Sequence, residues 1–97
     1  MIQYIGEFIG TFILILVVII SKNWLFIGIT LGTIILVGNN FYKVSFNPVV
    51  ALAHYVNNEI TLFDLCLYIL IEVIATIAAY MIYKTYIKNI KNIKNNK

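Results

Sequence analysis

The sequence predicts an all-α membrane protein with three transmembrane helices and one re-entrant half-helix. Three observations indicate this class: an apolar composition, hydrophobic segments of spanning length, and a short helix signal set between two of them. Of the 97 residues, 62% are hydrophobic and 11% are charged, and the mean hydropathy is +0.94. A soluble chain of this size has too little interior to hide so much apolar surface. We therefore expect one integral, multi-pass domain in a lipid bilayer, over residues 1–83, followed by a tail.

The first two predicted spans follow one another closely. The first covers residues 4–21 and is apolar except for Glu7. Met1–Ser21 lacks a basic N-terminal region and carries this acidic residue, so we interpret it as a retained helix and not as a signal peptide. The second span covers residues 24–40 and opens on Trp24, an aromatic residue of the kind found at membrane interfaces.

A short helix is predicted over residues 48–57. Asn47 is a preferred N-cap residue, and Pro48 suits the first helical position because its missing N–H would have no partner there. At ~1.5 Å per residue the segment is about 15 Å long, roughly half of a ~30 Å hydrocarbon core. A helix that starts inside a membrane needs a protein-lined or watery place. We therefore expect a re-entrant half-helix at a conduction site.

The third predicted span covers residues 61–83, with Asp64 near its start and Glu72 near its middle. Residues 84–97 form a basic tail of Lys, Asn and Ile. In one interpretation its isoleucines and lysines form a loosely amphipathic strip that attracts anionic lipid. In the other the tail is solvated and partly disordered, because Lys/Asn repeats cannot build a core.

Small residues spaced four apart occur in the first two spans. Gly6 and Gly10 form one G-x-x-x-G motif, and Gly28 and Gly32 form another. Such pairs let a neighbouring backbone approach closely, which favours helix association in lipid. The sequence allows two interpretations of these motifs: packing between helices of one chain, or contact between two chains in a dimer.

Three further motifs occur in order along the chain. They read Gly-Glu-Phe-Ile-Gly-Thr-Phe at residues 6–12, Phe-Asn-Pro-Val-Val-Ala-Leu-Ala at 46–53 and Tyr-Ile-Leu-Ile-Glu-Val-Ile-Ala at 68–75. They resemble the aquaporin, or major intrinsic protein, patterns Ala-Glu-Phe-x-Gly-Thr-Phe, Asn-Pro-Ala-Val-Thr and Tyr-x-x-Ala-Gln-x-x-Gly. Over about residues 4–83 the chain is therefore similar to a single three-helix repeat, or half, of these water and glycerol channels.

The resemblance implies a role for each residue at the start of the half-helix. Asn47 would donate a hydrogen bond to a passing water or hydroxyl, and Pro48 would fix the helix start. Val49 would pack where the half-helices of two repeats abut. Their positive ends would oppose protons and cations. From the residues alone, the alternative remains that Asn47 is a plain N-cap and binds no ligand.

Two acidic residues in the spans have alternative interpretations. The resemblance makes Glu7 a brace for the loop before the half-helix, and the alternative is exposure at the membrane interface. Glu72 stands where the family has a residue resembling Gln. It would act either as a protonated hydrogen-bond donor or as a charged group that favours cations, since ionisable groups at mid-membrane depth are usually functional.

The chain also departs from the family. It carries the motifs of one repeat only, so a complete pore would need another copy or a complementary repeat. It contains no arginine, whereas the family's second repeat has one in its selectivity filter. Residues 42–45 read Tyr-Lys-Val-Ser where a first repeat usually shows Ser-Gly-Ala-His.

The lysines predict an orientation. A re-entrant half-helix returns to its own side, so Lys43 shares one face with the N-terminus. The opposite face holds six lysines, which the positive-inside rule places in the cytoplasm together with the tail. This imbalance argues against an antiparallel homodimer, which needs both orientations. The six are Lys22, Lys84, Lys88, Lys91, Lys94 and Lys97.

The remaining reactive residues do not indicate an enzyme. Cys66 is the sole cysteine and is expected to be a packing residue. His54 is the sole histidine and is expected to satisfy a local hydrogen bond and not to bind a metal, since metal sites need clustered ligands. No nucleophile–base pair or phosphate-binding loop is evident. We expect no catalytic residue, no cofactor, no metal and no nucleic-acid partner.

The sequence therefore predicts a channel half that conducts water or small neutral solutes after assembling with a second repeat, as a homo-oligomer or with another protein. The alternative is a non-conducting truncated channel homologue that acts as a membrane interaction or modulator protein. A cation or proton leak through Glu72 is a third possibility.

Overall fold

The computed structural model describes residues 1–95, so the end of the predicted tail, residues 96–97, lies outside the described residues. All regular elements in the described part are helical, which confirms the predicted all-α class. In chain order they are α1 (Ile2–Ser21), α2 (Trp24–Gly38), α3 (Pro48–Val56), α4 (Leu62–Ile82), a π-helical turn (Tyr83–Ile87) and α5 (Lys88–Asn95).

Side-chain caps fix where α2 and α4 begin. Asn23 Oδ1 accepts a hydrogen bond from the amide of Leu25 at 2.8 Å, and Thr61 Oγ1 accepts one from the amide of Asp64 at 3.1 Å. Each cap satisfies an N–H group that has no partner within its own helix. The same local chemistry starts α3 at Asn47.

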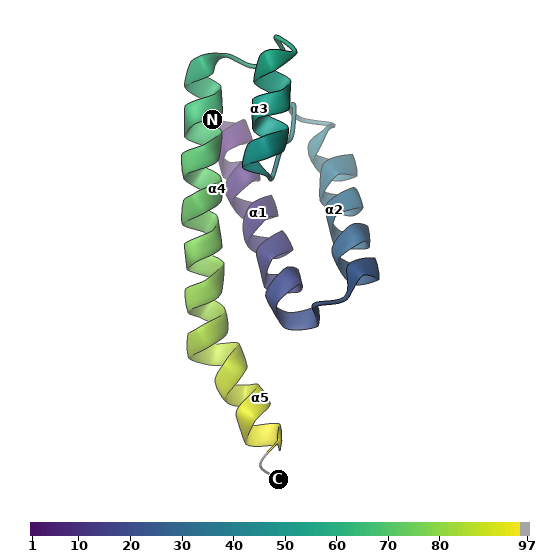
Figure 1. Cartoon of the computed structure of the whole chain (residues 1–97), viewed down its shortest axis with the longest axis vertical. Helices are drawn as coiled ribbons and strands as arrows, with labels where there is room; N and C mark the ends of the chain where they lie inside the picture. The colour runs from purple at the N-terminus through teal and green to yellow at the C-terminus, as the bar shows by residue number, and fades with distance from the viewer. Residues whose placement is uncertain (96–97) are drawn as a thin grey trace.

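The helices form a small bundle around α1 and α4. α4 packs along α1, α2 packs on another side of α1, and α3 packs against α4 (Figure 1). The chain extents are 54 × 23 × 20 Å. The N-terminus and the α3–α4 connection lie at one end of the bundle, whereas the α1–α2 connection and the C-terminus lie toward the other (Figure 1). The loop of residues 39–47 turns inward, and α3 then runs back toward the end that holds the N-terminus.

The contact between α1 and α4 follows one stripe on each helix. Near the N-terminus, the Tyr4 hydroxyl donates to Asp64 Oδ1 at 2.9 Å. Small residues on α4 let α1 approach closely farther along. Buried positions recur every three or four residues, as expected of helix faces in contact. They are Glu7, Gly10, Thr11 and Leu14 on α1 and Leu65, Tyr68, Glu72, Ala75 and Ala79 on α4.

The two G-x-x-x-G motifs have different surroundings. A Cβ atom added at Gly6 would lie 2.6 Å from a ring carbon of Tyr42, and one at Gly10 would lie closer still to the Phe46 ring. These two glycines therefore let the 39–47 loop approach α1. A Cβ atom at Gly28 or Gly32 would meet nothing within 4 Å.

Of the two interpretations of the motifs, packing within the chain is thus not found at Gly28 and Gly32. The reason is that α2 faces α1 through a different stripe, and both glycines are exposed beside it. The half-buried positions repeat with helical spacing. They are Ile27, Thr30, Leu31, Ile34, Ile35 and Gly38.

The interior of the bundle holds both polar and apolar side chains, and much of its surface is apolar. The largest fully buried side chains are Glu7, Glu72 and Ser45, whereas large apolar side chains are exposed along α1, α2 and α4. α1 and the continuous helical segment Leu62–Ile90 are each long and apolar enough to cross a membrane, and α2 is a shorter apolar helix. The exposed apolar residues include Ile5, Ile9, Phe26, Leu36, Leu70 and Ile77.

The third predicted span ends at residue 83, but the helix continues farther. The π-helical turn Tyr83–Ile87 joins α4 to α5 without a break, so helix covers the predicted tail as far as Asn95. Lys88, Ile90 and Lys94 are exposed there.

Candidate functional site

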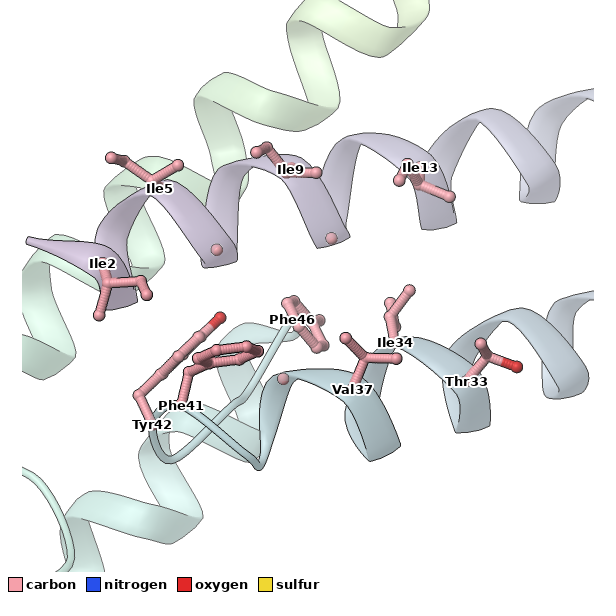
Figure 2. Close-up of a pocket in the computed structure, with 13 residues that line it drawn as sticks. Ile2, Ile5, Ile9, Ile13, Thr33, Ile34, Val37, Phe41, Tyr42 and Phe46 are labelled. Atoms are coloured by element: carbon pink, nitrogen blue, oxygen red, sulfur yellow. The ribbon is translucent and has the colours of Figure 1, made fainter.

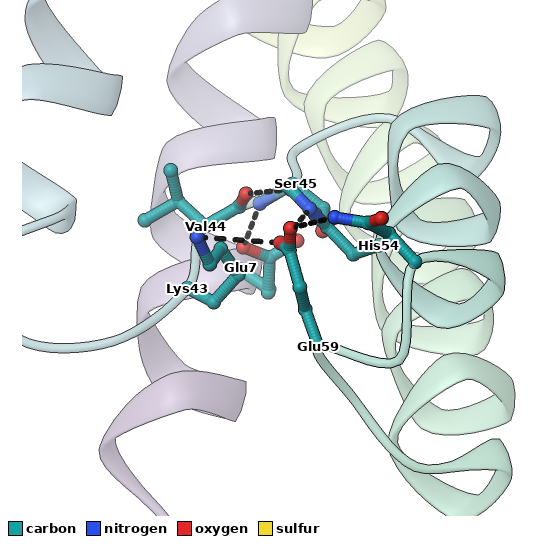
Figure 3. A network of polar contacts seen from close by, with 7 residues as sticks. Glu7, Lys43, Val44, Ser45, His54 and Glu59 are labelled. Atoms are coloured by element: carbon teal, nitrogen blue, oxygen red, sulfur yellow. Dashed lines mark hydrogen bonds and ion pairs between the residues drawn. The ribbon is translucent and has the colours of Figure 1, made fainter.

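Glu7 binds the loop that leads into α3. Its Oε2 accepts hydrogen bonds from the Tyr42 hydroxyl at 2.8 Å and from the Ser45 amide at 3.0 Å. Its Oε1 accepts one from the Phe46 amide at 2.8 Å. Glu7 is completely buried, so the structure gives it the contacts of a brace and not exposure at an interface. Figure 3 shows Glu7 beside the loop residues.

Phe46 adopts a left-handed backbone conformation in this loop. Its φ of 59° lies in the left-handed region, which costs roughly 1–2 kcal/mol for a residue with a Cβ atom. The amide bond to Glu7 and the burial of the ring against Gly10 hold this conformation. These contacts with α1 therefore fix the direction of the backbone just before α3 starts.

The residues predicted at the start of α3 lie at its N-terminus. Asn47 Oδ1 accepts a hydrogen bond from the Val49 amide at 2.8 Å, and Pro48 occupies the first helical position. The cap uses the side-chain oxygen, which leaves the amide Nδ2 of the exposed Asn47 available as a donor. Val49 is 73% exposed, so no part of the described chain covers the position that the resemblance assigns to an abutting half-helix.

Glu72 lies in the interior close to this point. It is 2% exposed, and neither carboxylate oxygen has a hydrogen-bond partner among the described residues. It lies beside the carboxyl group of Glu7 and the backbone of Asn47. The Thr11 hydroxyl, also 2% exposed, is likewise unpartnered there. Buried polar atoms without partners are rare in proteins.

Two grooves meet at Asn47. The first, about 300 Å³, lies between α1, α2 and the loop and includes Lys43, Ser45 and His54 in its lining. The second, about 380 Å³, lies between α1 and α4 below the start of α3 and is lined in part by the polar side chains of Thr11 and Glu72. We call these the loop groove and the Glu72 groove. Leu14 and Asn47 line both, so the two grooves adjoin at the start of α3.

A third groove, about 370 Å³, separates α1 from α2 near the N-terminus. Figure 2 shows Ile5, Ile9 and Ile13 of α1 on one side of it, with Val37 of α2 and the aromatic ring of Phe41 on the other. Its lining is almost wholly apolar. This groove offers a polar solute few hydrogen bonds and is a poor candidate for its path.

His54 ties the end of α3 to the loop. Its Nδ1 lies 2.8 Å from Glu59 Oε2 and its Nε2 lies 3.0 Å from the Val44 carbonyl oxygen. Both partners are acceptors, so both contacts are hydrogen bonds only when both ring nitrogens carry hydrogen. Lys43 Nζ also lies 3.2 Å from Glu59 Oε2. Figure 3 shows these four residues converging.

Glu59 is the centre of this cluster, and the sequence interpretation did not single it out. The hydrogen bond from Asn57, together with the contacts from Lys43 and His54, holds the pKa of the Glu59 carboxyl below its usual value. The signal in the sequence was a histidine in the last turn of a short helix with a glutamate five residues later. The predicted local hydrogen bond of His54 thus has defined partners.

The described part of the chain holds no group of residues that could ligate a metal ion. No three His, Cys, Asp or Glu residues gather there around a possible metal position. Cys66 is an exposed residue of α4.

Comparisons with protein-family models, with curated proteins and with solved structures found no match. The resemblance to aquaporins therefore stays a prediction that rests on the sequence motifs.

Proposed function

We propose that this chain is one half of a membrane channel that conducts water or small neutral solutes once a second repeat completes the pore. The observation that carries the proposal is the place where α3 begins. Asn47, at the amide end of α3, lines both the loop groove and the Glu72 groove. A helix terminus pointing into a passage offers oriented N–H dipoles to a polar solute.

A bilayer is the setting that suits the distribution of polar and apolar groups. α1 and Leu62–Ile90 have the length and composition of membrane spans, and the exposed side chains along the helices are largely apolar while the buried ones include two glutamates. Exposed apolar surface on this scale indicates contact with lipid or with partners.

We assign α2 as the third span and α3 as a re-entrant half-helix. α2 has 15 residues, which at ~1.5 Å per residue gives about 22 Å, less than a ~30 Å hydrocarbon core. Local thinning of the bilayer accommodates such a mismatch at modest cost. With α3 re-entrant, Asn40 and Leu62 emerge on the same side and Trp24 on the other. In Figure 1 the end of α2 and the start of α4 lie toward one end of the bundle, and the start of α2 lies toward the other.

The exposed start of α3 supports the need for a second repeat. Pro48 and Val49 are exposed, and the grooves beside Asn47 are open. A partner placed across this face would enclose the solute path and cover the start of α3. A second copy of the chain or a complementary repeat of another protein would each serve.

Liposome swelling tests the proposal. Liposomes containing the protein should swell faster than empty ones when osmotic strength is lowered, and Asn47→Ala should abolish the excess. Asn47→Asp keeps an oxygen for the cap but removes the amide donor, so it should also lose permeability. Asn23→Ala is the matched control, because Asn23 caps α2 in the same way but lies outside both grooves.

Equal swelling of the Asn47 variants and the unmodified protein would refute a role for Asn47 in conduction. Absence of swelling from inserted, oligomeric protein would favour the second candidate, a non-conducting membrane interaction protein. The observation in favour of that candidate is the exposed face of α2 at Gly28 and Gly32, which no described residue covers.

A further inference from the structure

The Glu72 groove contains buried oxygen atoms that nothing in the described chain satisfies. They are Thr11 Oγ1 and both carboxylate oxygens of Glu72, and each residue is 2% exposed. Leaving buried polar groups without partners costs free energy, and the cost is larger when the groups are charged. A bound group that satisfies several of them at once would remove this cost.

We propose that Glu72 and Thr11 bind a small monovalent cation, such as Na⁺ or K⁺, in the Glu72 groove. The site shares its groove with Asn47, so it bears on the class of solute that the proposed channel admits. Binding itself does not depend on conduction, and the inference can therefore hold or fail separately from the proposed function.

The chemistry of the unpartnered atoms selects a cation. All three are oxygens, and carboxylate and hydroxyl oxygens are the ligands of hard cations. The Thr76 side chain also lines the groove and donates to the Glu72 carbonyl at 2.8 Å, which leaves its hydroxyl oxygen able to accept a further contact. An anion would instead find no cationic side chain in the described lining of this groove.

The local charge favours one positive charge and not two. Glu7 lies beside Glu72, but three of the roughly four acceptor sites of its carboxylate already hold hydrogen bonds. Glu72 is the carboxylate with more free acceptor sites. The N-terminus of α3 contributes roughly half a positive charge, which offsets part of the negative charge of the pair. A divalent ion usually takes more oxygen ligands and more carboxylates than this site provides.

A proton on Glu72 is the competing explanation for its burial. Protonation would remove the charge and let the Glu72 carboxyl donate to the neighbouring Glu7, but it would still leave the Thr11 hydroxyl without a partner. A cation coordinated by these oxygens would satisfy Thr11 and Glu72 together. The two explanations differ in one measurable respect, because only the cation site distinguishes Na⁺ or K⁺ from a cation too large to enter.

Thermal unfolding of the full chain in detergent tests the site. A ligand that binds only the folded state raises the unfolding midpoint in proportion to the logarithm of its concentration. We expect the midpoint in NaCl or KCl to exceed that in choline chloride of equal ionic strength. The difference should vanish in Glu72→Gln and shrink in Thr11→Val, which removes the hydroxyl with little change in shape.

A control variant and the choice of measurement separate this site from other effects. Glu59→Gln removes an acidic residue outside the groove and should keep the difference between salts. The difference between salts is measured without any solute flux, so a failure of the channel proposal is distinguishable from a failure of the cation site. Equal midpoints in the three salts for the unmodified protein would overturn the inference and leave a proton as the occupant of Glu72. A difference that persists in both Glu72→Gln and Thr11→Val would overturn it as well.

Discussion

The backbone amide of Phe46 donates a hydrogen bond to Glu7 Oε1 at 2.8 Å across 39 residues of sequence. Phe46 precedes Asn47, the N-cap of α3, so this bond ties the start of α3 to the second turn of α1. The position of α3 therefore depends on a buried carboxylate as well as on its own sequence.

Replacing Glu7 by Gln should destabilise the fold. Glu7 accepts three hydrogen bonds, but a glutamine has only one acceptor oxygen, and its NH₂ group would face a donor. We expect a loss of ~1–3 kcal/mol for each buried donor left unsatisfied. The free energy of unfolding, measured by denaturant titration in detergent micelles, checks this.

Tyr42→Phe is the matched control for that variant, because it removes one of the three donors and leaves the carboxylate in place. It should cost less than Glu7→Gln. If the two variants were equally stable, the amides of residues 45 and 46 would not depend on Glu7 as described.

Glycine substitutions should separate the two G-x-x-x-G motifs. Gly10→Ala places a methyl group against the buried Phe46 ring, and overpacking of this kind costs ~1–3 kcal/mol. Gly32→Ala meets nothing within 4 Å and should leave the monomer as stable, or more stable by up to ~1 kcal/mol, because alanine favours helix. Unfolding curves of the two variants measure the contrast.

The oligomeric state of the same variants carries further information. If Gly32→Ala weakens association while the monomer stays folded, the exposed face of α2 is a contact between chains. Equal destabilisation of the monomer by the two substitutions would contradict the packing described here.

Local sequence signals predicted the helices. The contacts between helices and loop depend on residues far apart in the sequence, and local signals did not predict them. Apolar composition indicated the all-α class, and the pair Asn47–Pro48 predicted the cap because capping depends on adjacent residues only. The brace by Glu7 came from the resemblance and not from periodicity, since its partners lie far along the chain.

The exposure of Gly28 and Gly32 was not predictable from the motif. The spacing of small residues shows which face allows close approach, but it does not show whether a partner is present. The role of Glu59 was missed for a related reason. Glu59 follows the end of α3, and its contact with Lys43 depends on the path of the inward-turning loop, which no local pattern describes.

The cluster around Glu59 should make the loop sensitive to acid. The pKa of Glu59 is lowered in the folded state, with the hydrogen bond from Asn57 as the largest cause. Its stabilising contribution is therefore fully present above the pKa of the unfolded chain and is lost as the pH falls through the lower, folded value. Amide hydrogen exchange near Val44 should show protection that declines over this acidic range.

Glu59→Gln should remove this acid-dependent part of the protection. Asp64→Asn is a suitable comparison, since Asp64 binds Tyr4 and lies outside the cluster. An unchanged pH profile in Glu59→Gln would show that the tie between α3 and the loop does not depend on this carboxylate.

The proposed topology predicts which residues share a side of the membrane. Trp24, Asn40 and Leu62 are exposed at the ends of helices. Cysteines introduced singly as Trp24→Cys, Asn40→Cys and Leu62→Cys, in a Cys66→Ser background, can be labelled in sealed vesicles with a maleimide that does not cross membranes. A re-entrant α3 places Asn40 and Leu62 on one side and Trp24 on the other.

The labelling pattern distinguishes arrangements that are equally compatible with the apolar composition. If α3 crossed the bilayer completely, Asn40→Cys and Leu62→Cys would label from opposite sides, and Asn47 would lose its place in a passage. If each site labelled half from either side, the chain would insert in both orientations, and an antiparallel homodimer would become the simplest complete pore. The lysines on the side of Trp24 favour a single orientation, with that side in the cytoplasm. We therefore expect one labelling pattern, with Asn40 and Leu62 on the side away from the cytoplasm. The second repeat would then not come from a copy inserted in the opposite orientation.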